Sequence, residues 1–301
     1  MDDELAELLA SGERAAFHGR PAAGVAPLQR AVEIAHSAGR DAEATAAVWL
    51  LGVCLAAAGR YGSAATVLEP LAVALPEEPE RRLFSSLAAS TMASISRQLG
   101  RHAEGRVRDE VALDVGHDAP EARFDALLGL AADAVGLGEE PEAAVRLGEA
   151  AELVGPRPEW WRQRVRVDWV AAEVALMQDR ADDAVARASA AVQLAEASGA
   201  PRHVAKGLLF QGVAEVQSGA LDEAAGTLRR AATLAESVGA LPLVWPARAV
   251  LGALVGESGA AEAASCLAAA RAAVRQISED LPSPLAQEWL ARPDIAALLD
   301  G

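Results

Sequence analysis

The chain is poor in aromatic residues and in lysine, and it holds only two cysteines. Phenylalanine, tryptophan and tyrosine make up 4% of the 301 residues, and Lys206 is the single lysine. A β-sandwich rich in aromatic strands is therefore excluded by composition. Cys54 and Cys266 lie far apart, without a CxxC or metal-ligand spacing. We therefore expect two buried thiols in a reduced cytoplasm.

Long apolar runs and an excess of positive charge are also missing. No stretch of about 18 uninterrupted apolar residues occurs, and a membrane-spanning helix needs one. The acidic start MDDELAELLA lacks the basic and apolar regions of a signal peptide. The net charge of −16 disfavours binding to nucleic-acid phosphates and to anionic membrane surfaces. We predict a cytoplasmic protein with no membrane and no nucleic-acid partner.

Alanine is the residue that the chain has in excess. It contains 73 alanines, which is roughly a quarter of its residues. Alanine is the strongest helix former, and a chain of this length can bury a large core. The composition therefore predicts an all-α protein whose core is built from small side chains, and it disfavours a doubly wound sheet.

Turn residues recur at a nearly fixed step of 38 to 41 residues. They are Gly19, Gly59, Gly100, Gly138, Asp179, Gly219 and Gly259. Seven residues before and five residues after each of them, every position holds glycine or alanine, from Gly12 and Gly24 in the first unit to Gly252 and Ala264 in the last. Helices that cross closely need small side chains where their axes approach, and glycine permits the left-handed end of a helix. Each unit is therefore predicted to be a hairpin of two helices.

One hairpin cannot bury its own apolar face, so stacked neighbours bury it for one another. The sequence predicts about seven such hairpins in a repeat array over residues 1–280, followed by a capping helix over residues 281–301. The third and fourth units fit the pattern least well, since Ser90, Ser94 and Ser96 lie on the first helix of the third. The approximate unit boundaries are 2–39, 40–78, 79–117, 118–156, 157–199, 200–240 and 241–280.

The second unit resembles the tetratricopeptide repeat, and residues 208–240 are similar. The resemblance is carried by Leu51, Gly52, Leu55, Gly59, Tyr61, Ala64, Leu68 and Pro76. It extends over essentially the whole chain, with a step near 40 in place of the usual ~34. It implies a right-handed α-solenoid similar to the long-helix arrays at the C-terminal end of bacterial signalling ATPases and transcription regulators. The sequence has no GxxxxGK[ST] loop, so we expect no ATPase module in it.

In that family the first helix of each repeat lines a concave groove, and the groove positions can be carried over to this sequence. They fall on Trp49, Arg97, Gln98, Arg166, Trp169, Met177, Lys206 and Gln217. Tryptophan and cationic residues suit a protein or peptide partner with apolar and acidic side chains. A second interpretation is that the two tryptophans fill space between adjacent helices and that the cations are solvated surface charges. The family's lysine–asparagine clamp for chaperone tails does not occur at these positions.

Trp160 and Trp161 form a separate cluster at the start of the fifth unit. They either pack against the fourth unit or form a secondary patch for a partner. No HExxH, GxSxG or dinucleotide-binding fingerprint occurs, and the five histidines are scattered. We therefore predict no catalytic site, no cofactor and no metal site, and we do not expect an enzyme.

These features predict a non-enzymatic scaffold or regulatory adaptor that binds a protein or peptide in its groove. Two alternatives stay open at this point. The first is a sensor of a small molecule or signal peptide that regulates transcription through a partner, in which case the ligand stabilises the protein. The second is a structural array that stacks end to end, which a mass measurement in solution would detect.

Overall fold

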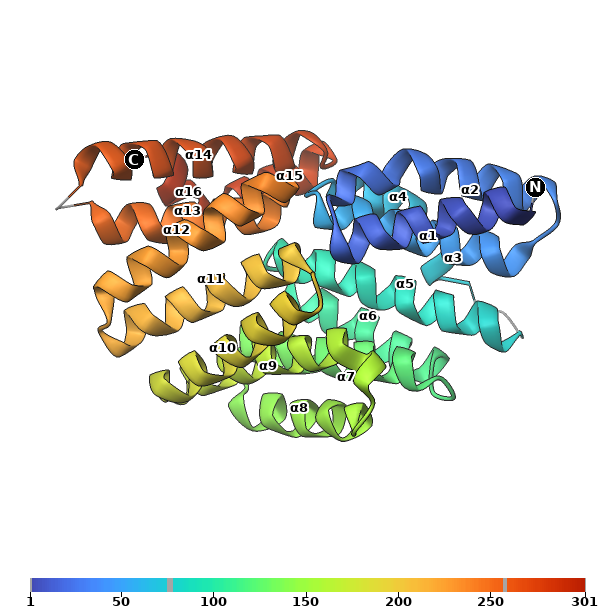
Figure 1. Ribbon diagram of the computed structural model, residues 1–301, viewed down its shortest axis with the longest axis horizontal. Helices are drawn as coiled ribbons and strands as arrows, with labels where there is room; N and C mark the ends of the chain where they lie inside the picture. Colours follow the sequence, from blue (N-terminus) through green and yellow to red (C-terminus); the bar gives the residue numbers. More distant parts are fainter. Residues whose placement is uncertain (1, 75–77, 257–258, 301) are drawn as a thin grey trace. The chain divides into compact units, whose positions relative to one another are not determined.

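The computed structural model describes residues 2–74, 78–256 and 259–300, and helices make up nearly all of these residues (Figure 1). Pro76, which contributes to the repeat resemblance, lies outside the described residues. The chain divides into two compact units. Unit 1 comprises residues up to 57 together with 61–163, and unit 2 comprises 58–60 together with the residues from 164 onward. Each unit is an all-α solenoid of stacked helical hairpins.

In its described residues, unit 1 forms four hairpins. Their helices are α1 (Asp2–His18), α2 (Val25–Ser37), α3 (Asp41–Ala57), α4 (Tyr61–Ala72), α5 (Pro79–Gln98), α6 (His102–Val115), α7 (Pro120–Gly136) and α8 (Glu140–Val154). Two short 3-10 helices accompany them, η1 (Pro21–Gly24) before α2 and η2 (Pro158–Trp160) after α8.

The described part of unit 2 continues with three hairpins. Their helices are α9 (Trp161–Met177), whose first three residues belong to unit 1, α10 (Ala181–Ala197), α11 (Pro201–Ser218), α12 (Leu221–Val238), α13 (Leu241–Val255) and α14 (Ala260–Glu279). We call the first helix of each hairpin its A helix and the second its B helix. Over the described ranges, no helix combines the length and the apolar character that a membrane crossing requires.

The single capping helix predicted over residues 281–301 is wrong. Two short helices follow α14, namely α15 (Ser283–Leu290) and α16 (Pro293–Asp300). A proline disfavours helical backbone at the residue before it, so Pro293 interrupts the helix at Arg292 and begins the next one. Both short helices contact α14, and Trp289 and Ile295 are buried. The segment therefore packs on the last hairpin as two pieces.

Left-handed residues end most of the A helices. Among the predicted turn residues, Gly59, Gly100, Gly138, Asp179 and Gly219 have φ between 54° and 85°. This confirms the predicted left-handed ends at five of the seven turns. In the first hairpin, 3-10 helix η1 follows the turn. In the last hairpin Gly259 is not left-handed, with φ −142°. There Ala264 is exposed and Ala263 is buried, so the predicted small position is wrong by one residue.

The predicted small residues lie where the two helices of a hairpin cross. A Cβ added at Gly12 or Gly52 would overlap the side chain of Leu28 or Leu68, and one at Gly212 would lie 2.7 Å from Leu228. These leucines are fully buried on the B helices.

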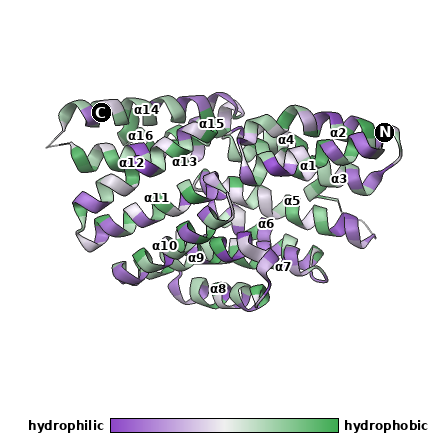
Figure 2. Cartoon of the chain, in the orientation of Figure 1, coloured by the Kyte–Doolittle hydropathy of each residue, from purple (hydrophilic) through white to green (hydrophobic). Residues whose placement is uncertain are grey.

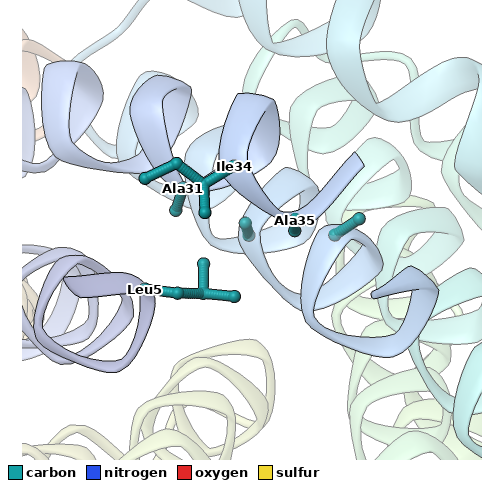
Figure 3. Close-up of a cluster of buried hydrophobic side chains, with 6 residues drawn as sticks. Leu5, Ala31, Ile34 and Ala35 are labelled. Carbon is teal, nitrogen blue, oxygen red and sulfur yellow. The ribbon is translucent and has the colours of Figure 1, made fainter. Parts of the chain in front are cut away.

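Small and branched side chains also build the packing between hairpins. One buried hydrophobic cluster joins the first two hairpins. In this cluster Leu5 of α1 faces Ala31 and Ile34 of α2 (Figure 3), and two alanines of α3 complete it. Apolar and polar residues share most helices (Figure 2), as expected for helices that bury one side. Cys54 and Cys266 are buried thiols, as predicted.

Two buried serines of the third unit, Ser85 and Ser86, satisfy helix ends. Ser85 Oγ lies within hydrogen-bond distance of the carbonyl oxygens of Leu71 and Ala74, near the end of α4, and its one hydroxyl proton is shared between them. Ser86 Oγ donates to the carbonyl oxygen of Ala112, in the last turn of α6. The last carbonyl groups of a helix lack partners within the helix. Ser85 and Ser86 of α5 therefore bind the ends of the two neighbouring B helices.

The close crossing at Gly52 leads to a testable contrast with Gly148. We expect Gly52→Ala to lower the free energy of unfolding by about 1–3 kcal/mol, because the buried Leu68 cannot move away from the added methyl group. Gly148 is exposed on α8 and its Cβ would meet nothing within 4 Å. We expect Gly148→Ala to stabilise by about 0.5–1 kcal/mol through helix propensity. Equal stabilisation by both changes in chemical denaturation would contradict the crossing.

Candidate functional site

All the predicted groove residues lie on A helices. In unit 1, α3 carries Trp49, and α5 carries Arg97 and Gln98. In unit 2, α9 and α11 carry the remainder, namely Arg166, Trp169, Met177, Lys206 and Gln217. Successive A helices contact one another directly, as α1, α3, α5 and α7 do in unit 1 and as α11 and α13 do in unit 2. Within each unit these helices therefore form a layer, which we call the A-helix face.

Three aromatic rings follow one another across the A-helix face of unit 1. Trp49 lies between Phe17 of α1 and Phe84 of α5, with ring centres 6.5 and 5.8 Å away. Its Nε1 donates a hydrogen bond of 3.3 Å to Thr91 Oγ1 of α5. Phe17 is buried, whereas Trp49 and Phe84 are half-buried. We call Phe17, Trp49 and Phe84 the aromatic row.

One cation stands above the aromatic row. The Arg162 guanidinium, at the start of α9, lies 4.6 Å from the centre of the Phe17 ring. Arginine over an aromatic face is attracted by the ring's quadrupole. The row therefore combines apolar surface with a positive charge at one end.

A second cluster surrounds the single lysine in unit 2. Lys206 Nζ lies 4.7 Å from the ring centre of Trp169 and 5.5 Å from that of Phe210. The Trp169 ring is stacked on His203, with ring centres 5.5 Å apart and planes inclined by 20°. Lys206 and Phe210 are half-buried, while Trp169 is only 5% exposed and His203 is buried. We call Trp169, His203, Lys206 and Phe210 the Lys206 cluster.

The other predicted groove residues of unit 2 divide by exposure. Arg166 and Met177 are half-buried on α9. Gln217 is exposed, and its Nε2 donates hydrogen bonds to the Leu176 carbonyl oxygen at 3.2 Å and to Asp179 Oδ1 at 3.4 Å. Asp179 is the left-handed residue that ends the hairpin's first helix. Gln217 therefore ties the end of α11 to the turn after α9.

The two tryptophans of the predicted secondary patch have different surroundings. Trp160 is 6% exposed, with its ring centre 6.0 Å from that of Phe124 in an edge-on arrangement. The Arg157 guanidinium covers it at 4.5 Å. It thus packs against the fourth hairpin and offers little surface to a partner. Trp161 is half-buried, and its ring centre lies 5.4 Å from that of His18.

The structure does not place Arg97 in an open groove. Its Nη1 donates hydrogen bonds to Asp109 Oδ2 of α6 at 2.5 Å and to Asp133 Oδ2 of α7 at 2.9 Å. Both carboxylates are 0% exposed, and the Arg97 side chain is 14% exposed. His102 Nδ1 lies 3.7 Å from Asp133 Oδ1. We call Arg97, His102, Asp109 and Asp133 the Arg97 network. Arg97 is held by two buried carboxylates, and its role in binding a partner stays a prediction.

Glycine residues make room for the charged groups of this network. A Cβ at Gly129 would overlap the Asp109 carboxylate, and one at Gly105 would lie 2.7 Å from Asp133 Oδ1. The Oδ2 atom of each aspartate accepts the hydrogen bond from Arg97. The other oxygens, Asp109 Oδ1 and Asp133 Oδ1, are buried and accept no hydrogen bond from the described residues.

Burial dominates the protonation of Asp109. It raises the pKa of this carboxyl group, and the attraction and hydrogen bond of Arg97 oppose that effect without cancelling it. The negative charge of Asp133 raises the pKa further, and the Ser90 hydroxyl lowers it slightly. The result is a pKa of about 7. Over the described part of the chain, no group of three or more His, Cys, Asp or Glu side chains is arranged to hold a metal ion.

A break in the repeat pattern marks the residues of the network that sequence reasoning missed. Sixteen residues after the small residue of the A helix, the first, second and sixth units hold Leu28, Leu68 and Leu228, whereas the third unit holds Asp109. Two residues after that small residue, the second unit holds Cys54 and the fourth holds Asp133. Comparing equivalent positions between units would have identified both aspartates. Phe84, Phe210 and His203 gave no such signal.

Comparisons with known proteins find similarity in structure. No family model matches the sequence, and no curated protein matches it. A Rap protein complexed with Competence and Sporulation Factor superposes with a TM-score of 0.64 and 13% identity, over 98% of this chain and 80% of the other. Aspartyl phosphate phosphatase F from Bacillus subtilis gives 0.53 and 14% identity, over 99% and 82%.

A third solved structure gives a TM-score of 0.52 and 13% identity, over 92% of this chain and 41% of the other. It is a Signal Transduction ATPase with Numerous Domains from Pyrococcus horikoshii that has a tetratricopeptide repeat sensor. The chain therefore has the tetratricopeptide type of helical repeat fold, as the sequence predicted.

The Arg97 network predicts a large loss of stability when its cation is removed. Arg97→Leu leaves two carboxylates buried without a partner, so we expect the free energy of unfolding to fall by about 3–5 kcal/mol in chemical denaturation. Arg229→Leu is the matched control. Its ion pair with Glu262 is solvated, so stability should barely change. Similar small effects of both substitutions would show that the buried charges contribute little.

Proposed function

We propose that this tetratricopeptide-type helical repeat protein is a non-enzymatic adaptor that binds another protein or a peptide on its A-helix face. The observation that carries the proposal is the placement of the few aromatic and cationic side chains. Much of the packing between the helices uses alanine, glycine and leucine. Half-buried rings and a lysine nevertheless stand on A helices of both units, as Trp49, Phe84, Lys206 and Phe210.

The aromatic row supports a site for apolar side chains in unit 1. Trp49 and Phe84 each keep part of their ring surface exposed, and they come from neighbouring helices. Large, rigid aromatic side chains supply contact area at a low cost in conformational entropy, and they dominate the energy of many interfaces. A partner would bury this exposed ring surface against its own apolar residues.

The Lys206 cluster supports a site for an acidic group in unit 2. The lysine is held over Trp169 and Phe210, so its position is fixed by contacts within the face. Arg166 lies on α9 three residues before Trp169, on the same side of the helix. In a chain with a net charge of −16, these cations form a local exception. A carboxylate of the partner would be attracted here and repelled by most of the remaining surface.

The structural neighbours agree with a binding role. The Rap protein was solved in complex with Competence and Sporulation Factor, so a protein of this fold holds a separate partner. The array in the Pyrococcus horikoshii protein is described as a sensor. A sensor that acts through a partner is therefore the second candidate for this chain. A ligand-dependent rise in thermal stability across a metabolite and peptide panel would favour it.

The proposal is tested by selecting peptides that bind the protein and then measuring their affinities. A displayed library of random 12-residue peptides would be selected on the purified full chain, and the enriched peptides would be synthesised with a fluorescent label. We expect enriched sequences to combine apolar residues with Asp or Glu. Their affinities would be measured by fluorescence anisotropy, with a parallel set in which every Asp and Glu is replaced by Asn and Gln. Enrichment of basic sequences, or no enrichment, would contradict the proposal.

Charge reversal at the lysine tests the acidic site. We expect Lys206→Glu to weaken binding of an enriched peptide at least tenfold, about 1.4 kcal/mol, and Lys206→Arg to retain most of the affinity. Arg230→Glu is the matched control, because it makes the same charge change at an exposed position on α12, the B helix of the same hairpin. It should change the affinity less than twofold. Equal losses for both reversals would indicate a general charge effect without a site at Lys206.

Removal of one ring tests the aromatic row. We expect Trp49→Leu to weaken binding about three- to tenfold, because the substitution removes aromatic surface and the hydrogen bond to Thr91 while keeping an apolar side chain. Circular dichroism and the thermal midpoint establish that the variant is folded at the assay temperature. A folded variant with unchanged affinity for every enriched peptide would exclude the row from the site.

A further inference from the structure

The Arg97 network carries one negative charge too many for its surroundings. It sets one guanidinium between two carboxylates that are 0% exposed. With both aspartates ionised and His102 neutral, a net charge of −1 remains at a site shielded from water. An uncompensated buried charge is strongly unfavourable, and such groups take up a proton in preference to remaining charged. The cluster therefore needs one more positive charge than its own arginine provides.

The geometry offers a place for that charge. Asp109 Oδ1 accepts no hydrogen bond from the described residues, so Asp109 can carry a proton there without breaking the bond from Arg97 to its Oδ2. His102 Nδ1 lies 3.7 Å from Asp133 Oδ1. Gly105, Gly129 and Gly136 lie close against these side chains and leave them little freedom to move.

We propose that the Arg97 network is a proton-linked joint, in which one proton taken up near neutral pH holds α6 against α5 and α7, and its release loosens this part of unit 1. The groups that face Asp109 are Arg97 and the Ser90 hydroxyl from α5 and Asp133 from α7. On α6 itself, His102 lies near Asp133, and Arg106, which is paired with Glu139, also interacts electrostatically with Asp133. The inference is independent of what the A-helix face binds.

The direction of the pH effect follows from the pKa of Asp109. The pKa is about 7 in the folded protein and 3.8 for an ordinary aspartate. Between these values the folded state holds a proton that the unfolded state has lost, so stability falls as the pH rises. The stabilisation is complete below about pH 4 and is lost as the pH passes through 7. The opening equilibrium of the segment should therefore shift about 30-fold between pH 5.5 and pH 8.

Hydrogen exchange measured by mass spectrometry tests the joint on the full chain. After correction for the intrinsic pH dependence of exchange, we expect the amides of α6 and α7 to lose about 30-fold in protection between pH 5.5 and pH 8. Helix α13 serves as an internal reference, because it carries no Asp, Glu or His. Unchanged protection of α6 and α7 would overturn the proposal.

Variants locate the effect. Asp109→Asn mimics the protonated carboxyl group and leaves Asp133 to pair with Arg97. In this variant the hydrogen-exchange protection of the α6 and α7 amides should change less than threefold between pH 5.5 and pH 8. Glu110→Gln removes a carboxylate from an exposed position on the same helix and should behave like the natural chain. A full 30-fold loss in Asp109→Asn would overturn the assignment to this network.

A measurement on the unsubstituted protein covers the case in which Asp109→Asn does not fold. Aspartate labelled with carbon-13 at the side-chain carboxyl would be followed by NMR from pH 4 to pH 8.5. We expect at least one aspartate signal to titrate between pH 6 and pH 8. Asp133→Asn also leaves one carboxylate for Arg97 and should remove that titration. If every aspartate signal completes its titration below pH 6, the network holds no such proton and the proposal fails.

Discussion

The close approach of two helices at one small residue is the constraint on which each hairpin depends. Where Gly12, Gly52 and Gly212 cross their B helices, a buried leucine fills the space that a side chain would occupy. This contact brings the helix axes together, and the left-handed residue at the turn lets the chain reverse. Alanine and glycine are thus abundant because the hairpins require them, and their abundance leaves the rings and charges free to appear elsewhere.

The same crossing explains how a charged network fits inside the array. In the third unit Asp109 stands at the position that leucine occupies in other units, and Gly129 of the next A helix stands against it. A carboxylate therefore replaces an aliphatic side chain at the closest point of packing. Its partner Arg97 comes from α5, and the second carboxylate comes from α7. The network thus joins three helices of two successive hairpins through buried charges, whereas the Arg229–Glu262 pair between α12 and α14 is exposed to solvent.

Periodicity in the sequence was sufficient for the architecture because each hairpin repeats the same local solution. It predicted the helix pairs, most turn residues and the crossing positions. Periodicity did not predict the burial of Arg97, because the family pattern assigns this residue to the concave face but carries no information about the side chains that neighbouring helices place opposite it. The burial of a tryptophan side chain is equally hard to predict from its position in the repeat. Trp49 and Trp169 occupy the same kind of position, yet Trp169 is buried by His203 and Lys206 from α11. The break between the two C-terminal helices at Arg292 was predictable from the sequence, since Pro293 follows it.

The contrast between the two tryptophans bears directly on function. A ring that is buried by its neighbours contributes to the stability of the fold, and its presence needs no partner to explain it. Trp169 and Trp160 are of this kind. Trp49 and Phe84 keep part of their surface in water. Lys206 is likewise fixed by rings on the same face. Partly exposed rings on a layer of A helices leave apolar surface in water, and a bound partner would cover that surface.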